Sequence, residues 1–191
     1  MITSKKEYYE YLRQDQLALG RKKDVRPHLF GDEIWKLERL LRQVEYTKNC
    51  KKGPVGTMFG KYYGYRFHRL SVRLGMTLPI NVFGPGLSIP HYGTIVVHAN
   101  AKIGRNCRLQ EGVTIGATGG SHEAAVIGNN CYFGSGAKVI GAVRIADDVA
   151  VGANAVVTRD IPEAGTTWAG IPARKISDNN SHASLCQALF G

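Results

Sequence analysis

The sequence predicts a mainly β fold: a parallel β-helix of hexapeptide repeats, preceded by an α-helical N-terminal region. Large apolar residues recur six positions apart, without a break from Ile127 to Val157. A small or β-branched residue stands four places after most of them, and glycine often follows them directly. A period of six fits neither an α-helix nor a single strand, but it fits coils built from three short strands and tight turns. The repeated apolar positions are Ile103, Leu109, Ile115, Ile127, Phe133, Val139, Ile145, Val151 and Val157.

Three parts follow from this pattern: an α-helical region over residues 1–75, the β-helix over residues 76–177 and a tail over residues 178–191. The repeat is interrupted twice. Ile95 and Ile103 stand eight apart, which predicts a two-residue insertion at residues 96–98. Two repeats flanking residues 116–126 stand twelve apart around a glycine-rich stretch, which predicts a loop pushed out of the coil.

The N-terminal region contains three segments with helical signals. The first begins with a Ser-x-x-Glu capping box at Ser4 and extends to about Leu19. The second is expected over residues 32–48 and the third over residues 57–74, separated by a break at residues 49–54. Several aromatic residues of the third segment are expected to pack against neighbouring helices: Tyr62, Tyr63, Tyr65 and Phe67.

The net charge of +10 is unevenly distributed along the chain. Residues 1–75 contain 17 Lys and Arg against 8 Asp and Glu, whereas residues 76–191 contain 8 against 7. No nucleic-acid-binding motif accompanies the basic half, so we expect an anionic small molecule or a solvated helical face rather than nucleic acid. No apolar run is long enough to cross a membrane, and the first residues are polar, which predicts a cytoplasmic protein without membrane contact. Cys107 and Cys131 occupy the small interior position of the repeat and are expected to be reduced.

Three motifs give the chain a resemblance to a known family: Pro90–Val97 (PHYGTIVV), Gln110–Gly116 (QEGVTIG) and Ala169–Arg174 (AGIPAR). Together with the repeat they resemble the hexapeptide-repeat acyltransferases, specifically the serine acetyltransferases, over residues 76–177. The resemblance implies a left-handed β-helix, trimers, acetyl-CoA as donor, and active sites between neighbouring subunits. We expect a homotrimer or a dimer of trimers, and no metal.

Acetyl transfer to a hydroxyl needs a base, and His91 matches the family's catalytic histidine. The family's orienting aspartate lies fifteen residues earlier, where this chain has Met76, and the acidic residue just before the histidine is replaced by Pro90. One coil of 18 residues plus the two-residue insertion predicts that Glu111 stacks on His91 at about 4.8 Å. Glu111 is therefore either a replacement for the missing acidic partner of His91 or a solvated turn residue. His122 in the extruded loop falls near the position of the family's second histidine. It is interpreted either as an active-site residue or as an exposed loop residue.

The resemblance also implies where coenzyme A binds. Its pantetheine arm needs close approach to backbone amides, and its phosphates need donors and cations. The expected residues are Gly136, Ala153, Thr158, Arg159, Arg174 and Lys175.

The expected function is serine O-acetyltransferase, the first step toward cysteine. The first alternative is O-acetylation of a sugar hydroxyl in surface polysaccharide synthesis, which the substitutions at Met76 and Pro90 favour. The others are a metal-dependent carbonic anhydrase and a non-catalytic trimeric scaffold. The tail is polar over residues 178–184 and is expected to be mobile. It closes on glycine rather than on an apolar anchor, so binding to cysteine synthase is expected to be weak or absent.

Overall fold

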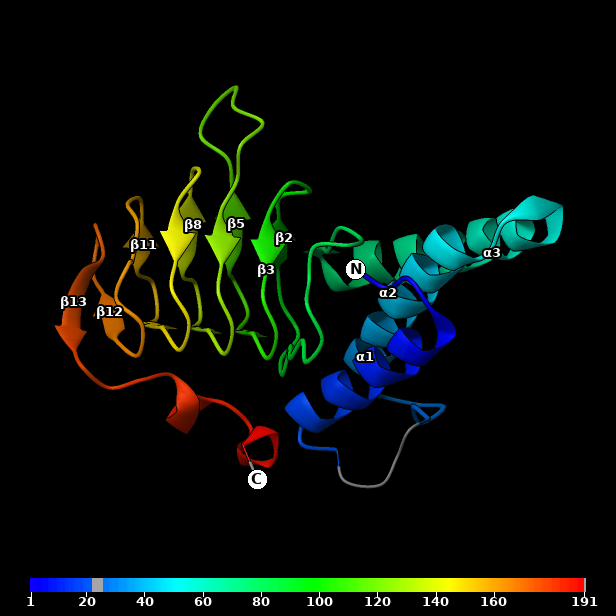
Figure 1. Cartoon of the computed structure of the whole chain (residues 1–191), viewed down its shortest axis with the longest axis horizontal. Helices are drawn as coiled ribbons and strands as arrows, with labels where there is room; N and C mark the ends of the chain where they lie inside the picture. Colours follow the sequence, from blue (N-terminus) through cyan, green and yellow to red (C-terminus); the bar gives the residue numbers. More distant parts are fainter. Residues whose placement is uncertain (22–25, 191) are drawn as a thin grey trace.

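The structure is a computed structural model that describes residues 1–21 and 26–190. Helices form one end of the molecule and a coil of short strands forms the other, with the C-terminal tail running back beneath the coil to the first helix (Figure 1). The helices are α1 (Lys5–Ala18), α2 (Glu33–Cys50) and α3 (Gly53–Leu74). None of the helices in the described ranges is both long and apolar enough to cross a membrane.

The first helix begins as predicted, with Ser4 as its N-cap. The Ser4 hydroxyl accepts a hydrogen bond from the Glu7 N–H at 3.1 Å. The Glu7 carboxylate accepts from the N–H and the hydroxyl of Thr3, both at 2.7 Å. The chain before α1 is thereby held by a carboxylate whose pKa these hydrogen bonds lower.

The break between α2 and α3 is shorter than the sequence suggests. Helix α2 continues to Cys50, and α3 already begins at Gly53, so only Lys51 and Lys52 separate them. Pro54 was expected to belong to the break, but it stands in the first turn of α3. Proline is tolerated there because the N–H groups of the first turn have no acceptor within the helix.

The prediction that the aromatic residues of α3 are core residues is wrong for Tyr62 and Tyr65, which are 52% and 62% exposed. The buried residues of α3 include Gly56 and Gly60. A Cβ on Gly60 would lie 3.9 Å from the Thr47 hydroxyl of α2, and one on Gly56 would lie 2.6 Å from the Lys51 carbonyl oxygen, so both glycines stand at close contacts that a side chain would disturb. Among the aromatics, Phe67 packs against the core while half-buried.

The strands form three flat parallel sheets, as a β-helix requires. The first sheet contains β1 (Met76–Thr77), β2 (Ile95–Val97), β5 (Thr114–Gly116), β8 (Lys138–Ile140) and β11 (Val156–Val157). The second contains β4 (Arg108–Leu109), β7 (Tyr132–Phe133), β10 (Ala150–Val151) and β12 (Thr167–Ala169), closed by antiparallel β13 (Arg174–Ser177). The third contains β3 (Lys102–Ile103), β6 (Val126–Ile127) and β9 (Arg144–Ile145).

The interior of the coil is filled by the residues of the six-residue period. Phe133, Val139 and Val151 have no exposed surface, and the other repeated positions are at most 5% exposed. Asn106 and Asn130 adopt positive φ in the turns, and their side chains stack, with Asn106 Nδ2 donating to Asn130 Oδ1 at 2.9 Å. The loop between β5 and β6 projects from the coil as predicted (Figure 1).

Strand pairing corrects the predicted position of the two-residue insertion. Both Ile95 and Val97 are buried in β2, but Val97 keeps the six-residue register with the next coil. The chain before the insertion already pairs with that coil at Ser88. Ser88 and Arg108 are 20 residues apart, but Gly93 and Glu111 are 18 apart, so the extra residues lie within residues 89–92, not at residues 96–98. They widen the corner that leads into β2.

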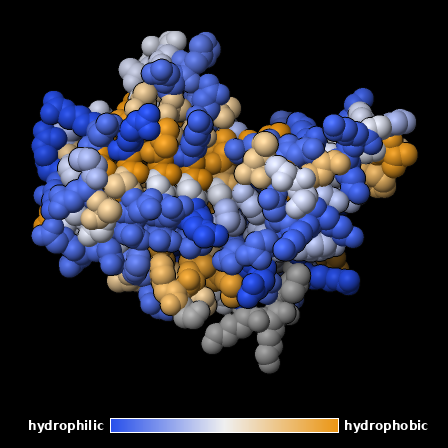
Figure 2. Space-filling view, in the orientation of Figure 1, coloured by the Kyte–Doolittle hydropathy of each residue, from blue (hydrophilic) through white to orange (hydrophobic). Residues whose placement is uncertain are grey.

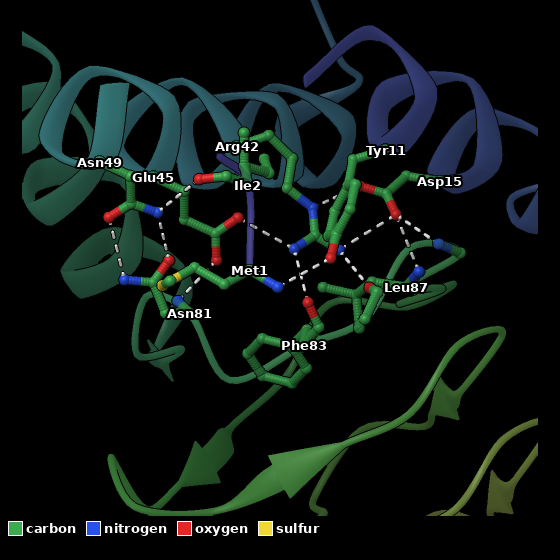
Figure 3. A network of polar contacts seen from close by, with 12 residues as sticks. Met1, Ile2, Tyr11, Asp15, Arg42, Glu45, Asn49, Asn81, Phe83 and Leu87 are labelled. Atoms are coloured by element: carbon green, nitrogen blue, oxygen red, sulfur yellow. Dashed lines mark hydrogen bonds and ion pairs between the residues drawn. The ribbon is translucent and has the colours of Figure 1, made fainter. Parts of the chain in front are cut away.

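A buried ion-pair network fastens the helices to the first turns of the β-helix (Figure 3). Arg42 of α2 has no exposed surface and pairs with Asp15 of α1 at 2.8 Å and with Glu45 at 3.1 Å. Asp15 Oδ1 accepts hydrogen bonds from the N–H groups of Gly86 at 2.8 Å and Leu87 at 2.9 Å. Burial alone lowers the pKa of Arg42, but the two carboxylates outweigh it and raise that pKa, so the guanidinium stays charged.

Helix side chains also satisfy other backbone groups of this irregular first coil. Arg42 donates to the carbonyls of Phe83 at 3.0 Å and Gly84 at 2.7 Å. The Glu38 carboxylate of α2 accepts from the N–H of Ile89 at 3.0 Å. Buried backbone groups need such partners, so the helices complete the coil where strand pairing is missing.

The tail packs against the molecule, which differs from the expected mobile segment. The Ser181 N–H donates to the Asp148 carbonyl at 3.1 Å, and His182 Nε2 lies 2.7 Å from Asp148 Oδ1. Leu185 is buried, and Phe190 stacks on the His182 ring at 4.1 Å. The tail contains two 3₁₀ helices, η1 (His182–Ser184) and η2 (Gln187–Leu189), of which η2 contacts α1.

Candidate active site

His91 lies at the widened corner before β2. Its side chain is exposed, and it makes no hydrogen bond or ion pair with the residues that the structure describes. Ile89, two places earlier, is fully buried in the coil, whereas Gly93, two places later, has a φ of 143°. The irregular backbone thus turns His91 away from the apolar interior and leaves both ring nitrogens available to a substrate.

Glu111 lies beside this corner, but it does not stack on His91 as predicted. A Cβ on Gly93 would lie 2.7 Å from the Glu111 Cβ, so Gly93 is the residue that faces Glu111. The reason is the position of the insertion. Ser88 still stands 20 residues before its partner Arg108, whereas Gly93 stands 18 residues before Glu111, so the two extra residues come before Gly93. Only glycine fits there, because both the positive φ and the close contact exclude a side chain.

The surroundings of Glu111 favour its ionised form. The hydroxyl of Ser135, on the next coil, is the largest influence that lowers the pKa of Glu111, and the charge of His91 lowers it further. Glu111 Oε2 is buried and has no hydrogen-bond partner among the described residues. A carboxylate with a free oxygen therefore lies close enough to His91 to act on its charge.

His122 is exposed in the loop between β5 and β6. Its carbonyl accepts a hydrogen bond from Asn100 Nδ2 at 2.7 Å, which ties the base of this loop to the neighbouring coil. Within the described part of the chain, no hydrogen bond or ion pair joins His122 to His91 or Glu111.

The two positions where the resemblance led us to expect acidic residues hold the apolar residues Met76 and Pro90. Met76 is 3% exposed in β1, and Pro90 lines a cavity beneath α2. A carboxylate approaches the same segment from another direction, because the Tyr92 hydroxyl donates to Glu33 of α2 at 3.0 Å.

The expected coenzyme A residues lie at the C-terminal end of the coil. Thr158, Arg159 and Arg174 line one cavity of about 320 Å³ together with Trp168. Arg174 is exposed, and its Nη1 donates to the carbonyl of Ala173 at 3.1 Å. This cavity presents two guanidinium groups without a carboxylate ion pair among the described residues.

The other three expected coenzyme A residues, Lys175, Gly136 and Ala153, do not line this cavity. The Lys175 ammonium pairs with Asp178 at 2.5 Å and Glu163 at 2.6 Å, and both carboxylates raise its pKa. Its charge is therefore already compensated. Gly136 has a φ of 74°, and a Cβ there would lie 2.1 Å from the Asn154 side chain, so its first role is to permit the turn. Ala153 is exposed on the next coil.

Sequence reasoning missed Ser135, Gly93 and the Tyr92–Glu33 contact. Ser135 stands 24 residues after Glu111, the same offset that pairs Leu109 with Phe133. Adding the residues of the extruded loop to the length of this coil would have identified Ser135 as the neighbour of Glu111. The contact with Glu33 joins a helix to the coil, and no sequence period reports it. Among the described residues, no group of three or more His, Cys, Asp or Glu side chains is placed to hold a metal ion.

The coil is similar in sequence to known proteins. Residues 124–159 match the family described as bacterial transferase hexapeptide, with six repeats. The chain carries the bacterial transferase hexapeptide repeat. A serine acetyltransferase of Helicobacter pylori strain J99 is 41% identical over 96 residues, which cover 49% of this chain and 56% of that protein. The chain thus spans about half the length of the curated relatives it matches.

Solved structures extend the likeness to the N-terminal helices. A serine acetyltransferase from Brucella abortus strain S19 superposes with a TM-score of 0.69 at 21% identity, covering 93% of this chain and 72% of that one. A serine acetyltransferase in complex with CoA superposes with a TM-score of 0.68 at 21% identity, covering 90% of this chain and 71% of the other. The predicted fold, a left-handed β-helix behind an α-helical region, is confirmed.

Proposed function

We propose that the chain is an acetyl-CoA-dependent serine O-acetyltransferase in which His91 is the general base. The observation that carries this proposal is the exposed His91, free of any bonded partner among the described residues, beside the ionised Glu111. The corner lies on a coil similar to those of serine acetyltransferases. Histidine suits the step because its pKa lies close to neutrality.

The reaction then needs three events at this corner. A ring nitrogen of His91 takes the proton of the acceptor hydroxyl while the oxygen attacks the thioester carbonyl. The carbon–sulfur bond breaks as the carbonyl re-forms, and the imidazolium returns its proton to the departing CoA sulfur. Glu111, ionised and next to His91, stabilises the imidazolium between these events, and His122 from the loop contacts the acceptor.

For the donor, we propose that acetyl-CoA lies along the stacked turns at Gly136 and Ala153. Its phosphates reach the cavity lined by Thr158, Arg159 and Arg174. Guanidinium groups without carboxylate partners are suited to phosphate, whereas the paired Lys175 contributes little. The similar fold of a serine acetyltransferase solved with CoA supports this placement.

A sugar hydroxyl is the second candidate acceptor. It is favoured by Met76 and Pro90, which put no carboxylate where an amino acid's ammonium group would need one. The two are separated by measuring thiol release from acetyl-CoA with L-serine and with a panel of free and nucleotide-linked sugars. We expect L-serine to react at least about tenfold faster than any sugar. The reverse order would assign the chain to sugar O-acetylation.

We propose a trimer, or a pair of trimers, as the working assembly. Hydrophobic residues gather on the face of the coil below the extruded loop and at the outer end of α3 (Figure 2). Val96 and Val126 on the coil are 38% and 36% exposed, which association of three copies would bury. Sedimentation is expected to give a trimer or hexamer, and a monomer at micromolar concentration would contradict this.

For the tail, we propose weak or absent binding to cysteine synthase, since Leu185 is buried and Phe190 stacks on His182. We further propose a reducing compartment, the cytoplasm, as the site of action. The support is that Cys50, Cys107 and Cys131 are free thiols.

A further inference from the structure

A cavity of about 270 Å³ lies between the helical region and the β-helix, apart from the proposed coenzyme A groove. Part of its wall is apolar and comes from Ile34 and Trp35 of α2 and from Ile89 and Pro90 of the first coil. The volume is close to the lower end of the range for small-molecule sites, about 300–1,000 Å³. It is therefore large enough for a ligand of a few heavy atoms, and not for a coenzyme.

Two polar side chains in the wall have unused hydrogen-bonding groups. Ser88 is 3% exposed, and its hydroxyl has no partner among the described residues. Arg108 stacks beside Ser88 on the next coil, and its Nε is buried without a partner. No acid of the described ranges pairs with the Arg108 guanidinium. A buried donor without a partner costs about 1–3 kcal/mol, so both groups favour a ligand.

The other charged groups of the wall compensate one another. Arg21 binds Asp32 through two hydrogen bonds, each of 2.8 Å, which holds the pKa of Asp32 at about 2. Glu38, whose carboxylate accepts from the N–H of Ile89 in the wall, is fully buried, and this burial raises its pKa well above the usual range. Among the described residues of the wall, the Arg108 guanidinium therefore has no ion-pair partner, whereas Arg21 and Asp32 pair with each other.

We propose that this cavity binds a small organic carboxylate, with its carboxylate on Arg108 and the Ser88 hydroxyl and its apolar body against Trp35 and Pro90. The planar guanidinium matches a carboxylate in two-point contact. One free cation in a partly apolar wall suits a monoanion with a hydrocarbon part better than a phosphate dianion.

The site is separate from the reaction centre but adjacent to it. Pro90 and Tyr92 both line the cavity, and His91 stands between them in the sequence. A bound carboxylate would hold the backbone on both sides of His91. The inference does not depend on acetyl transfer, because binding can be measured without any substrate.

The test uses the fluorescence of Trp35. The chain has two tryptophans, so the Trp168→Phe variant leaves Trp35 as the sole reporter. Isobutyrate, isobutyramide and inorganic phosphate are titrated as probes, which separates carboxylate binding from uncharged and phosphate binding. The same titrations follow in Arg108→Gln and in the control Arg105→Gln, which removes an exposed arginine of the same coil outside the cavity.

We expect isobutyrate to bind with a Kd of about 1 mM, near −4 kcal/mol, and isobutyramide and phosphate to bind at least about tenfold more weakly. Arg108→Gln is expected to raise the Kd for isobutyrate at least about tenfold, and Arg105→Gln to leave it unchanged. Ligand-observed NMR on the unmodified chain compares isobutyrate with isobutyramide even if Arg108→Gln fails to fold. Equal binding of the acid and the amide, tighter binding of phosphate, or no effect of Arg108→Gln would each overturn the proposal.

Discussion

Asp15→Ala tests whether the helices hold the first coil of the β-helix in place. Asp15 has no exposed surface, and its carboxylate contacts Arg42 at 2.8 Å and 3.2 Å. The same carboxylate accepts from the N–H groups of Gly86 and Leu87. The substitution therefore removes one partner of a buried ion pair and leaves two backbone donors without an acceptor.

The expected cost follows from these contacts. Removing one partner of a buried ion pair costs about 3–5 kcal/mol, and each buried donor left without an acceptor adds up to about 1–3 kcal/mol. Glu45 still pairs with Arg42 at 3.1 Å, and water can enter at the new cavity, so the parts do not add fully. We expect the free energy of unfolding to fall by about 3–5 kcal/mol.

Urea unfolding at one fixed protein concentration measures this loss, and amide hydrogen exchange at Gly86 and Leu87 locates it. The control is Asp160→Ala, which removes an exposed carboxylate whose hydrogen bond within the described residues comes from the Arg144 N–H at 2.8 Å. The control should cost no more than about 1 kcal/mol. Equal losses in the two variants, or unchanged exchange at both amides, would refute the view that Asp15 fastens the coil.

Three further predictions concern the candidate site and the tail. Glu111→Gln should lower turnover at least about tenfold. The factor should be constant through neutral pH, because the pKa of Glu111 lies below its usual range and the charge that the substitution removes is present throughout. A loss of turnover confined to alkaline pH would contradict this. Arg174→Gln should raise KM for acetyl-CoA about tenfold while Lys175→Gln changes it less than about twofold, and equal effects would remove Arg174 from phosphate binding. His182→Ala should release the tail from Asp148 and speed its limited proteolysis, and an unchanged cleavage rate would contradict the observed packing.

The period of six predicted the coil because each repeat is a local event. A residue such as Phe133 must be large and apolar at its own place in the turn, whatever the rest of the chain does. The same local logic gave the positions of the helices and of the extruded loop. It failed in α3, where Gly60 faces Thr47 of α2 while Tyr62 and Tyr65 are exposed. The apolar period of a helix does not say which of its residues contact a neighbouring helix.

The site was less predictable because it lies where the period breaks. His91 was found from its motif, but its relation to Glu111 depended on where the two extra residues of this corner fall, and they come before Gly93. Burial of both Ile95 and Val97 hid that choice, and only pairing with the next coil decides it. The contact between Tyr92 and Glu33 joins segments 59 residues apart, beyond the reach of any spacing argument.

The central claim is that His91 is the base for acetyl transfer on this coil. The most direct measurement is the rate of thiol release from saturating acetyl-CoA and acceptor in His91→Ala, with His68→Ala, an exposed histidine of α3, as the control. We predict that His91→Ala lowers turnover by about two to four orders of magnitude with acetyl-CoA affinity unchanged, while His68→Ala keeps full activity. A His91→Ala variant that retains more than about a tenth of the turnover would contradict the account.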